Sequence, residues 1–246
     1  MRFFGSGSLF GTPSGSNPTP VQFGVLQEVS LDFNFTIKEL YGQYQFPVDI
    51  GRGTAKVTGK AKSGELDPDI LGTLFFNESL TTGQIIGVVN EAGTVPASST
   101  YTVTVTNSAT WTVDLGVFYA ATGVRMRRVA SAPSAGEYSV AAGVYTFASA
   151  DASTAVLISY EYTSNTGGRK FEITNNLLGD SPSFSMNFVG KRVSGGTTRN
   201  TTINLNRCMS SKLSLATKLE DFTIPDFDFN AMADDSGSVG TMSFTN

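Results

Sequence analysis

The segment Gly53–Lys60 is the first place where residue types and spacing suggest chemistry. In a phosphate-binding loop, backbone amides cradle the phosphates and the lysine after the second glycine neutralises their charge. Here five residues separate the glycines instead of four, and Ala61 stands where a serine or threonine would bind magnesium. Lysine and threonine alternate with apolar residues through the segment, so it predicts a β-strand and not a nucleotide site.

A second pattern, Asp226, Asp228 and Asn230, places oxygen ligands at alternate positions, as at the start of a calcium-binding loop. The glycine that such a loop requires is replaced by Ala231, and Gly237 occupies the position of the bidentate glutamate. The alternation with Phe227 and Phe229 is typical of a strand with one polar and one buried face. We therefore predict no metal site here.

The densest basic cluster comprises Arg125, Arg127 and Arg128. Basic patches bind phosphate, but no aromatic residues interleave with these arginines and the rest of the chain is not basic. We interpret the cluster as a strand face that pairs with acidic residues of a neighbouring strand.

Histidine is absent from the chain, and Cys208 is the only cysteine. Histidine supplies most general bases and much metal ligation, so catalytic triads, cysteine–histidine pairs and histidine–metal sites are excluded. A single cysteine allows neither an intrachain disulfide nor a thiolate zinc site. Carboxylate pairs and lysine nucleophiles stay open, but we predict no enzymatic activity and no cofactor.

The composition favours an all-β protein. Charged residues make up 15% of the 246 residues, against about 25% in an ordinary soluble domain.

A net charge of −4 is the wrong sign for binding nucleic acid through its phosphates, although DNA could still slide past such a protein. The sequence shows neither a signal-peptide pattern nor a membrane-spanning apolar run, so we expect assembly in the cytoplasm.

Apolar residues fall on alternate positions from Val29 to Ile37, which predicts a half-buried strand. Asp67 and Pro68 are suited to start one short helix that packs across an open sheet or barrel mouth. We predict a β-sandwich or β-barrel formed by 21–83 and 164–246. The residues between them, 84–163, form a short-stranded insertion or continue the same domain, with turns at 165–168 and 194–197 and a strand over 170–174.

Residues 1–20 are rich in Gly, Ser and Pro and predict a flexible N-terminal arm. The arm nevertheless carries Phe3, Phe4, Leu9 and Phe10, which are costly to leave in water. We expect these four side chains to anchor the arm on a neighbouring subunit, as an assembly interface.

Two sets of segments suggest a family. The first runs from Pro96–Val103 through Asp114–Tyr119, Pro133–Val140, Gly143–Phe147 and Ile158–Tyr162, and the second is Ile224–Gly237 with Val239–Met242. Together they resemble the major tail tube proteins of long-tailed bacteriophages. The resemblance implies a β-barrel or sandwich flanked by a helix, and homo-oligomeric, hexameric rings that stack, with other tail proteins, into the virion tail tube. The genome would pass through that tube without specific binding during ejection, and the family has no active site to carry over.

Two other classes stay open. A head decoration or tail-tip adhesion protein would also be β-rich, would form trimers or bind host-surface glycans, and would not form tubes. A glycan hydrolase needs only two carboxylates on a β scaffold. No acid pair stands in an aromatic cleft pattern, which favours the structural hypotheses.

Overall fold

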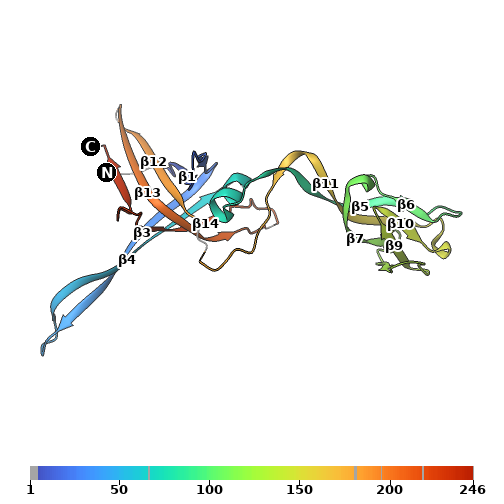
Figure 1. Ribbon diagram of the computed structural model, residues 1–246, viewed down its shortest axis with the longest axis horizontal. Helices are drawn as coiled ribbons and strands as arrows, with labels where there is room; N and C mark the ends of the chain where they lie inside the picture. Colours follow the sequence, from blue (N-terminus) through green and yellow to red (C-terminus); the bar gives the residue numbers. More distant parts are fainter. Residues whose placement is uncertain (1–4, 66, 180–181, 195, 218, 246) are drawn as a thin grey trace. The chain divides into compact units, whose positions relative to one another are not determined.

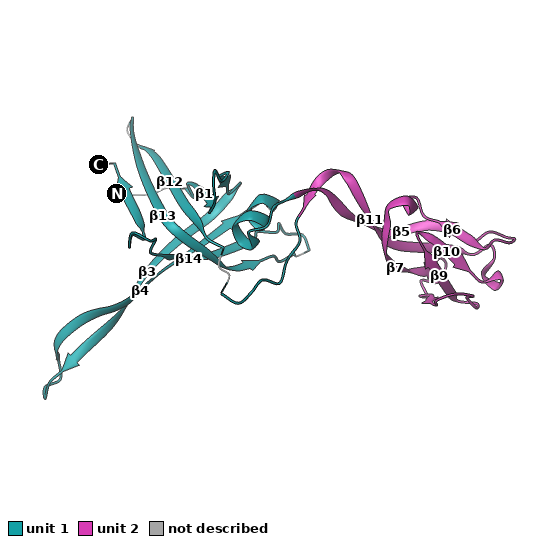
Figure 2. Ribbon diagram, in the orientation of Figure 1, with its two compact units in different colours: residues 1–80, 171–246 teal, residues 81–170 magenta. Residues whose placement is uncertain are grey.

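The computed structural model describes residues 5–65, 67–179, 182–194, 196–217 and 219–245. Regular structure in these residues is almost entirely β-strand, so the expected all-β class is confirmed. The chain divides into two compact units, Met1–Leu80 with Phe171–Asn246 (unit 1) and Thr81–Lys170 (unit 2; Figure 2). Unit 2 extends beyond the expected limits 84 and 163 because its first and last strands pair as far as Thr81 and Lys170.

Unit 1 is built on an eight-stranded sheet with the order β2-β1-β12-β13-β14-β4-β3, and β15 also pairs with β13 (Figure 1). Its strands are β1 (Ser8–Pro13), β2 (Val21–Gln22), β3 (Leu26–Tyr41), β4 (Pro47–Ser63), β12 (Phe184–Ser194), β13 (Thr197–Ser214), β14 (Asp226–Met232) and β15 (Gly240–Phe244).

The predicted short helix is confirmed as η1 (Ile70–Phe76), a π-helix. The Asp67 carboxylate accepts the backbone N–H of Asp69 at 2.8 Å, as expected of a residue that caps a helix start. Ile70 and Leu74 are buried in a core with Phe184, Phe227 and other apolar side chains from the sheet. η1 therefore closes one face of the unit 1 sheet.

The N-terminal segment differs from the expected flexible arm, because Ser8–Pro13 form β1 and pair with β12. Leu9 is 1% exposed and belongs to the unit 1 core. Gly11 permits this fit, since a Cβ there would clash with Leu74 of η1. A segment rich in glycine and serine can thus be ordered when its few apolar side chains find a core to enter.

Unit 2 contains a four-stranded sheet, order β6-β10-β9-β8, and a three-stranded sheet, order β5-β11-β7. The strands are β5 (Thr81–Thr94), β6 (Thr102–Thr104), β7 (Trp111–Tyr119), β8 (Arg127–Arg128), β9 (Glu137–Ala141), β10 (Val144–Phe147) and β11 (Ala155–Lys170), with single 3₁₀ turns η2 (Ser108–Thr110) and η3 (Ser149–Asp151). Apolar side chains of both sheets share one core, as in a sandwich.

The turn predicted over 165–168 is wrong, because β11 continues through these residues to Lys170. Gly167 and Gly168 have positive φ, and the register with β5 shifts between Ser164 and Arg169. The glycines therefore form an irregularity within a strand, for which they are as well suited as for a turn. The strand expected over 170–174 is also wrong, since residues 171–179 form no strand.

Across the described residues, the structure has no helix that is both long and apolar enough to span a lipid bilayer.

Candidate assembly surface

The β3–β4 hairpin is the longest antiparallel pairing in unit 1 that starts on the core and leaves it. Near its base, Val29 lies opposite Ala61 and Leu31 opposite Gly59. Ala61 is fully buried, and a Cβ at Gly59 would clash with the ring of Phe229. The predicted half-buried strand is confirmed over this part of β3.

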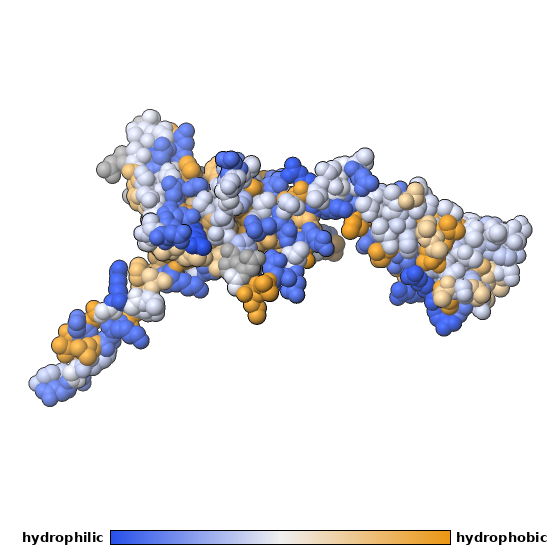
Figure 3. All heavy atoms as spheres, viewed as in Figure 1, coloured by the Kyte–Doolittle hydropathy of each residue, from blue (hydrophilic) through white to orange (hydrophobic). Residues whose placement is uncertain are grey.

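Beyond Leu31 the alternation continues but the burial stops. Phe33 and Phe35 are 44% and 46% exposed, and Phe46 is 81% exposed. Figure 3 shows apolar side chains gathered on this outer part of the hairpin, which extends away from the rest of unit 1. The exposed large apolar residues are Phe33, Phe35, Ile37, Leu40, Tyr41, Tyr44, Phe46, Val48 and Ile50, and we call them the apolar hairpin surface.

The apolar hairpin surface occupies both faces of the ribbon, since Ile37 and Leu40 are an odd number of residues apart in one strand. A two-stranded hairpin is at best marginally stable alone, and soluble monomers rarely expose apolar patches of this kind. The surface therefore has the properties of an interface that is uncovered in a single copy.

β3 also has an unpaired edge. It pairs with β4 on one side, and within the described part of the chain no strand pairs with its other side. A 16-residue edge strand offers a row of free N–H and C=O groups to another strand. The free edge and the apolar hairpin surface belong to the same strand, so one partner can cover both.

The unit 1 sheet has a second, polar face, on the side away from the core. Lys62 lies between Glu28 and Asp226 in the register, and its Nζ is 2.5 Å from the Glu28 carboxylate. The Lys60 ammonium is 3.1 Å from Asp226. Along β3, β4 and β14 this charged face comprises Glu28, Asp32, Lys56, Lys60, Lys62, Asp226 and Asp228. On these three strands the charged face holds four carboxylates and three lysines, of which Lys60 and Lys62 are paired, and Lys212 of the adjoining strand β13 lies opposite Asp228 in the register.

Of the residues expected to anchor the arm, Phe3 and Phe4 lie outside the described residues. Leu9 is in the unit 1 core and offers no exposed anchor, while Phe10 is half-buried in β1. Leu9 therefore does not belong to the apolar hairpin surface. Sequence reasoning missed that surface, although aromatic and β-branched residues on both faces from Leu40 to Ile50 were a usable signal for it.

No family model matches this chain, and no curated protein does.

Two of the three arginines of the unit 2 cluster, Arg127 and Arg128, are paired with acids, as predicted, whereas Arg125 forms no ion pair with the described residues. Arg127 lies opposite Glu137 in the parallel pairing of β8 and β9, and its Nε donates to that carboxylate at 3.0 Å. Arg128 is 3.6 Å from the carboxylate of Asp114. The Asp114 carboxylate also accepts the hydroxyl protons of Tyr138 and Tyr145, at 2.8 and 3.1 Å.

The two motifs that superficially suggested ligand chemistry are both strands. Gly53–Lys60 lies within β4, and Asp226–Asn230 lies within β14, where Phe227 and Phe229 are buried. No group of three metal-ligating His, Cys, Asp or Glu side chains occurs among the described residues. Cys208 is buried, and burial raises the pKa of its thiol to about 12, so it stays protonated at neutral pH.

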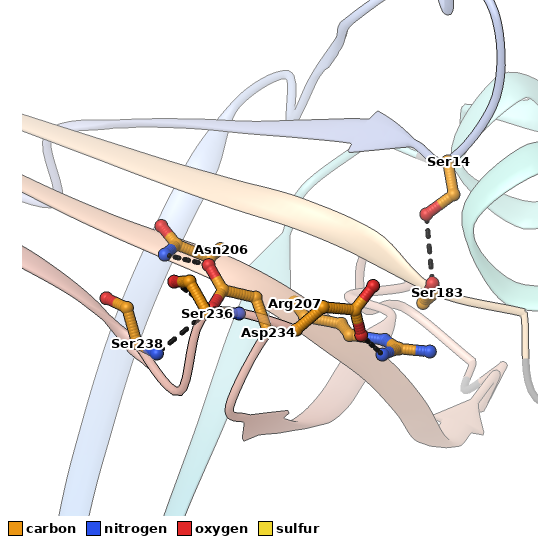
Figure 4. A network of polar contacts seen from close by, with 8 residues as sticks. Ser14, Ser183, Asn206, Arg207, Asp234, Ser236 and Ser238 are labelled. Carbon is orange, nitrogen blue, oxygen red and sulfur yellow. Dashed lines mark hydrogen bonds and ion pairs between the residues drawn. The ribbon is translucent and has the colours of Figure 1, made fainter.

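Asp234 organises the turn between β14 and β15 (Figure 4). Its carboxylate accepts the backbone N–H of Ser236 and of Ser238, at 3.0 and 2.9 Å, and the side-chain amide of Asn206 at 2.8 Å. The hydrogen bond from the Ser236 hydroxyl and these further donors lower the pKa of Asp234 to about 2. The turn therefore holds β15 against β13.

Proposed function

We propose that this chain is a structural virion protein that assembles with copies of itself into stacked rings, six subunits to a ring, and so forms the tail tube of a long-tailed bacteriophage. The apolar hairpin surface carries this proposal. Burying nine large apolar side chains against neighbouring copies offers about 1.5–3 kcal/mol for each side chain fully covered. An uncovered surface of that size would otherwise favour non-specific aggregation.

The free edge of β3 supports a ring in particular. A strand edge and a hairpin that reach a different patch on the neighbouring copy make a head-to-tail contact, and such contacts close into rings or continue into filaments. Closure of a ring removes the exposed edges that threaten a single subunit.

The charged face supports a channel for DNA. We assign it to the lumen, because the other face of the same sheet is occupied by the core and η1. Lys60 and Lys62 are each held by a carboxylate, so they are not free to grip phosphates. A lumen in which these lysines are paired with carboxylates binds phosphates weakly and so lets a duplex pass.

Electron microscopy of the purified chain over a range of concentrations tests the proposal. We expect tubes or stacked rings with a central channel wide enough for a DNA duplex, and weak binding of free duplex at physiological salt. Monomers or trimers without a channel at every concentration would contradict it and favour head decoration or tail-tip adhesion.

The proposed role requires no catalysis. We expect no hydrolase, transferase or redox turnover from the purified chain. Turnover of a polysaccharide that disappears on replacing one acidic residue would instead support a carboxylate-based hydrolase.

A further inference from the structure

Unit 2 has a strongly uneven distribution of positive charge. It contains five cationic residues, of which Arg169 and Lys170 stand at its end and the other three lie between positions 125 and 128. Arg125, Arg127 and Arg128 line a pocket of about 360 Å³ together with Met126 and Tyr138. That volume is at the lower end for small-molecule sites.

Two of these arginines are held in place by acids. Arg127 is hydrogen-bonded to Glu137, and Arg128 faces the Asp114 carboxylate, which is 3% exposed. Their own side chains stay 75% and 55% exposed, so each keeps N–H donors directed to solvent. The pairing fixes the guanidinium groups before any ligand arrives, which reduces the entropy lost on binding.

Arg125 supplies the uncompensated charge. Among the described residues no carboxylate pairs with it, and its guanidinium lies over the backbone of Gly116, where a Cβ would be 3.7 Å from Nη2. Burial and the hydrogen bond to Asp114 raise the pKa of Tyr138, and the charges of Arg128 and Arg125 act against that rise. Arg125 and Arg128 line the same pocket as Tyr138, whose hydroxyl donates to the Asp114 carboxylate that Arg128 also faces.

We propose that the pocket formed by Arg125, Arg127, Arg128 and Tyr138 binds an acidic saccharide through its carboxylate or phosphate group. Arginine forks match the geometry of both oxyanions. The ring of Tyr138 is buried, so the pocket has no aromatic platform for a nucleic-acid base. Three of the five lining residues are arginines, whose exposed N–H donors suit an oxygenated anion more than an apolar ligand. Binding of a saccharide at this pocket does not require the proposed tube.

Binding of the full-length chain to immobilised oligosaccharides tests this. The probes are a uronate-containing, a phosphorylated and a neutral oligosaccharide, with inorganic phosphate as a soluble competitor. We expect one or both acidic saccharides to bind and the neutral one to bind at least about tenfold more weakly. Arg125→Gln should lower the affinity about tenfold, as expected for the loss of a charge-assisted hydrogen bond. Preference for the uronate or for the phosphorylated probe identifies the oxyanion.

Arg199→Gln is the matched control, because it removes the same charge from an exposed position of β13 in unit 1. Circular dichroism should show both variants folded. Equal weakening by the two variants, binding no better than that of the neutral probe, or full displacement by inorganic phosphate at equal concentration would each overturn the proposal. An altered ring or tube in micrographs of Arg125→Gln, with saccharide binding unchanged, would identify the cluster as a subunit contact instead. Failure of tube formation by the unchanged chain would contradict the proposed function and leave this site standing.

Discussion

At the scale of single residues, the Asp234 carboxylate determines the geometry of one turn through its hydrogen bonds. One carboxylate accepts hydrogen bonds from two backbone N–H groups, a hydroxyl and an amide. Much of the turn between β14 and β15 therefore needs no water to satisfy its donors. Its neighbour Asp235 is almost fully exposed and forms one ion pair, with Arg207. Adjacent aspartates thus have very different roles.

We expect Asp234→Ala to loosen this turn and Asp235→Ala to leave it intact. Because the pKa of Asp234 is lowered, to about 2 from the usual 3.8, its stabilising effect is complete above pH 3.8 and is lost as the pH falls through 2. Amide chemical shifts of Ser236 and Ser238, followed by NMR in an acid titration, measure this. A midpoint near 4 for these amides would contradict the assignment.

Leu9 stabilises unit 1 from within the segment that sequence reasoning assigned to a flexible arm. We expect Leu9→Ala to lower the free energy of unfolding by about 2–4 kcal/mol, the usual cost of a cavity at a buried leucine. Leu178→Ala, at a fully exposed leucine of the same unit, should change it by less than about 0.5 kcal/mol. Urea unfolding followed by far-ultraviolet circular dichroism compares them. Equal stability of the two variants would return Leu9 to the role of an external anchor.

At the scale of elements, the proposed function predicts that the outer part of the β3–β4 hairpin contributes to assembly and not to folding. We expect Phe46→Ser with Val48→Ser to leave the thermal stability unchanged, because both side chains are more than 70% exposed. The concentration needed for assembly should rise at least tenfold, since each tenfold step corresponds to about 1.4 kcal/mol of lost contact. Light scattering against concentration measures this.

Leu177→Ser with Leu178→Ser is the control for that experiment. It removes the same kind of exposed apolar surface from unit 1 at positions outside the hairpin. Similar loss of assembly in both double variants would mean that general hydrophobicity, and not the apolar hairpin surface, drives association.

Alternation was sufficient to predict the strands at Val29–Ile37 and Asp226–Asn230, because a period of two reports which face is apolar. It did not predict that the core ends near Leu31. Burial depends on which other elements pack against a strand, and a local sequence pattern carries no information about them. The glycines at 167 and 168 were misassigned for a related reason: positive φ serves a turn and a bulge equally. Leu9 was misassigned because its partners, such as Leu74 and Phe184, lie far away in the sequence.

At the scale of the whole molecule, the proposed tube predicts that paired charges limit how strongly an assembly binds DNA. We expect Glu28→Gln with Asp226→Asn to release Lys62 and Lys60 and so to strengthen duplex binding by assembled particles. Each lysine freed to contact a phosphate should steepen the dependence of log affinity on log salt by about 0.9. Fluorescence anisotropy of a labelled duplex between 50 and 200 mM salt, in the range where this effect is large, measures it.

Glu172→Gln with Glu220→Gln changes the net charge equally, at exposed acids outside the charged face. If this double variant gains as much DNA affinity, then net charge alone governs binding and the assignment of the charged face to the lumen fails.

The pairing of Thr81 with Lys170 has a consequence for how such a chain can change. The two points where the chain enters and leaves unit 2 are neighbours across a strand pair, so a two-residue hairpin turn can join them. Unit 2 is therefore an exchangeable cassette: its removal, or its replacement by a foreign domain with adjacent ends, requires no rearrangement of the chain path in unit 1. A gene that encodes this layout can acquire such a unit by a single insertion and lose it by a single deletion.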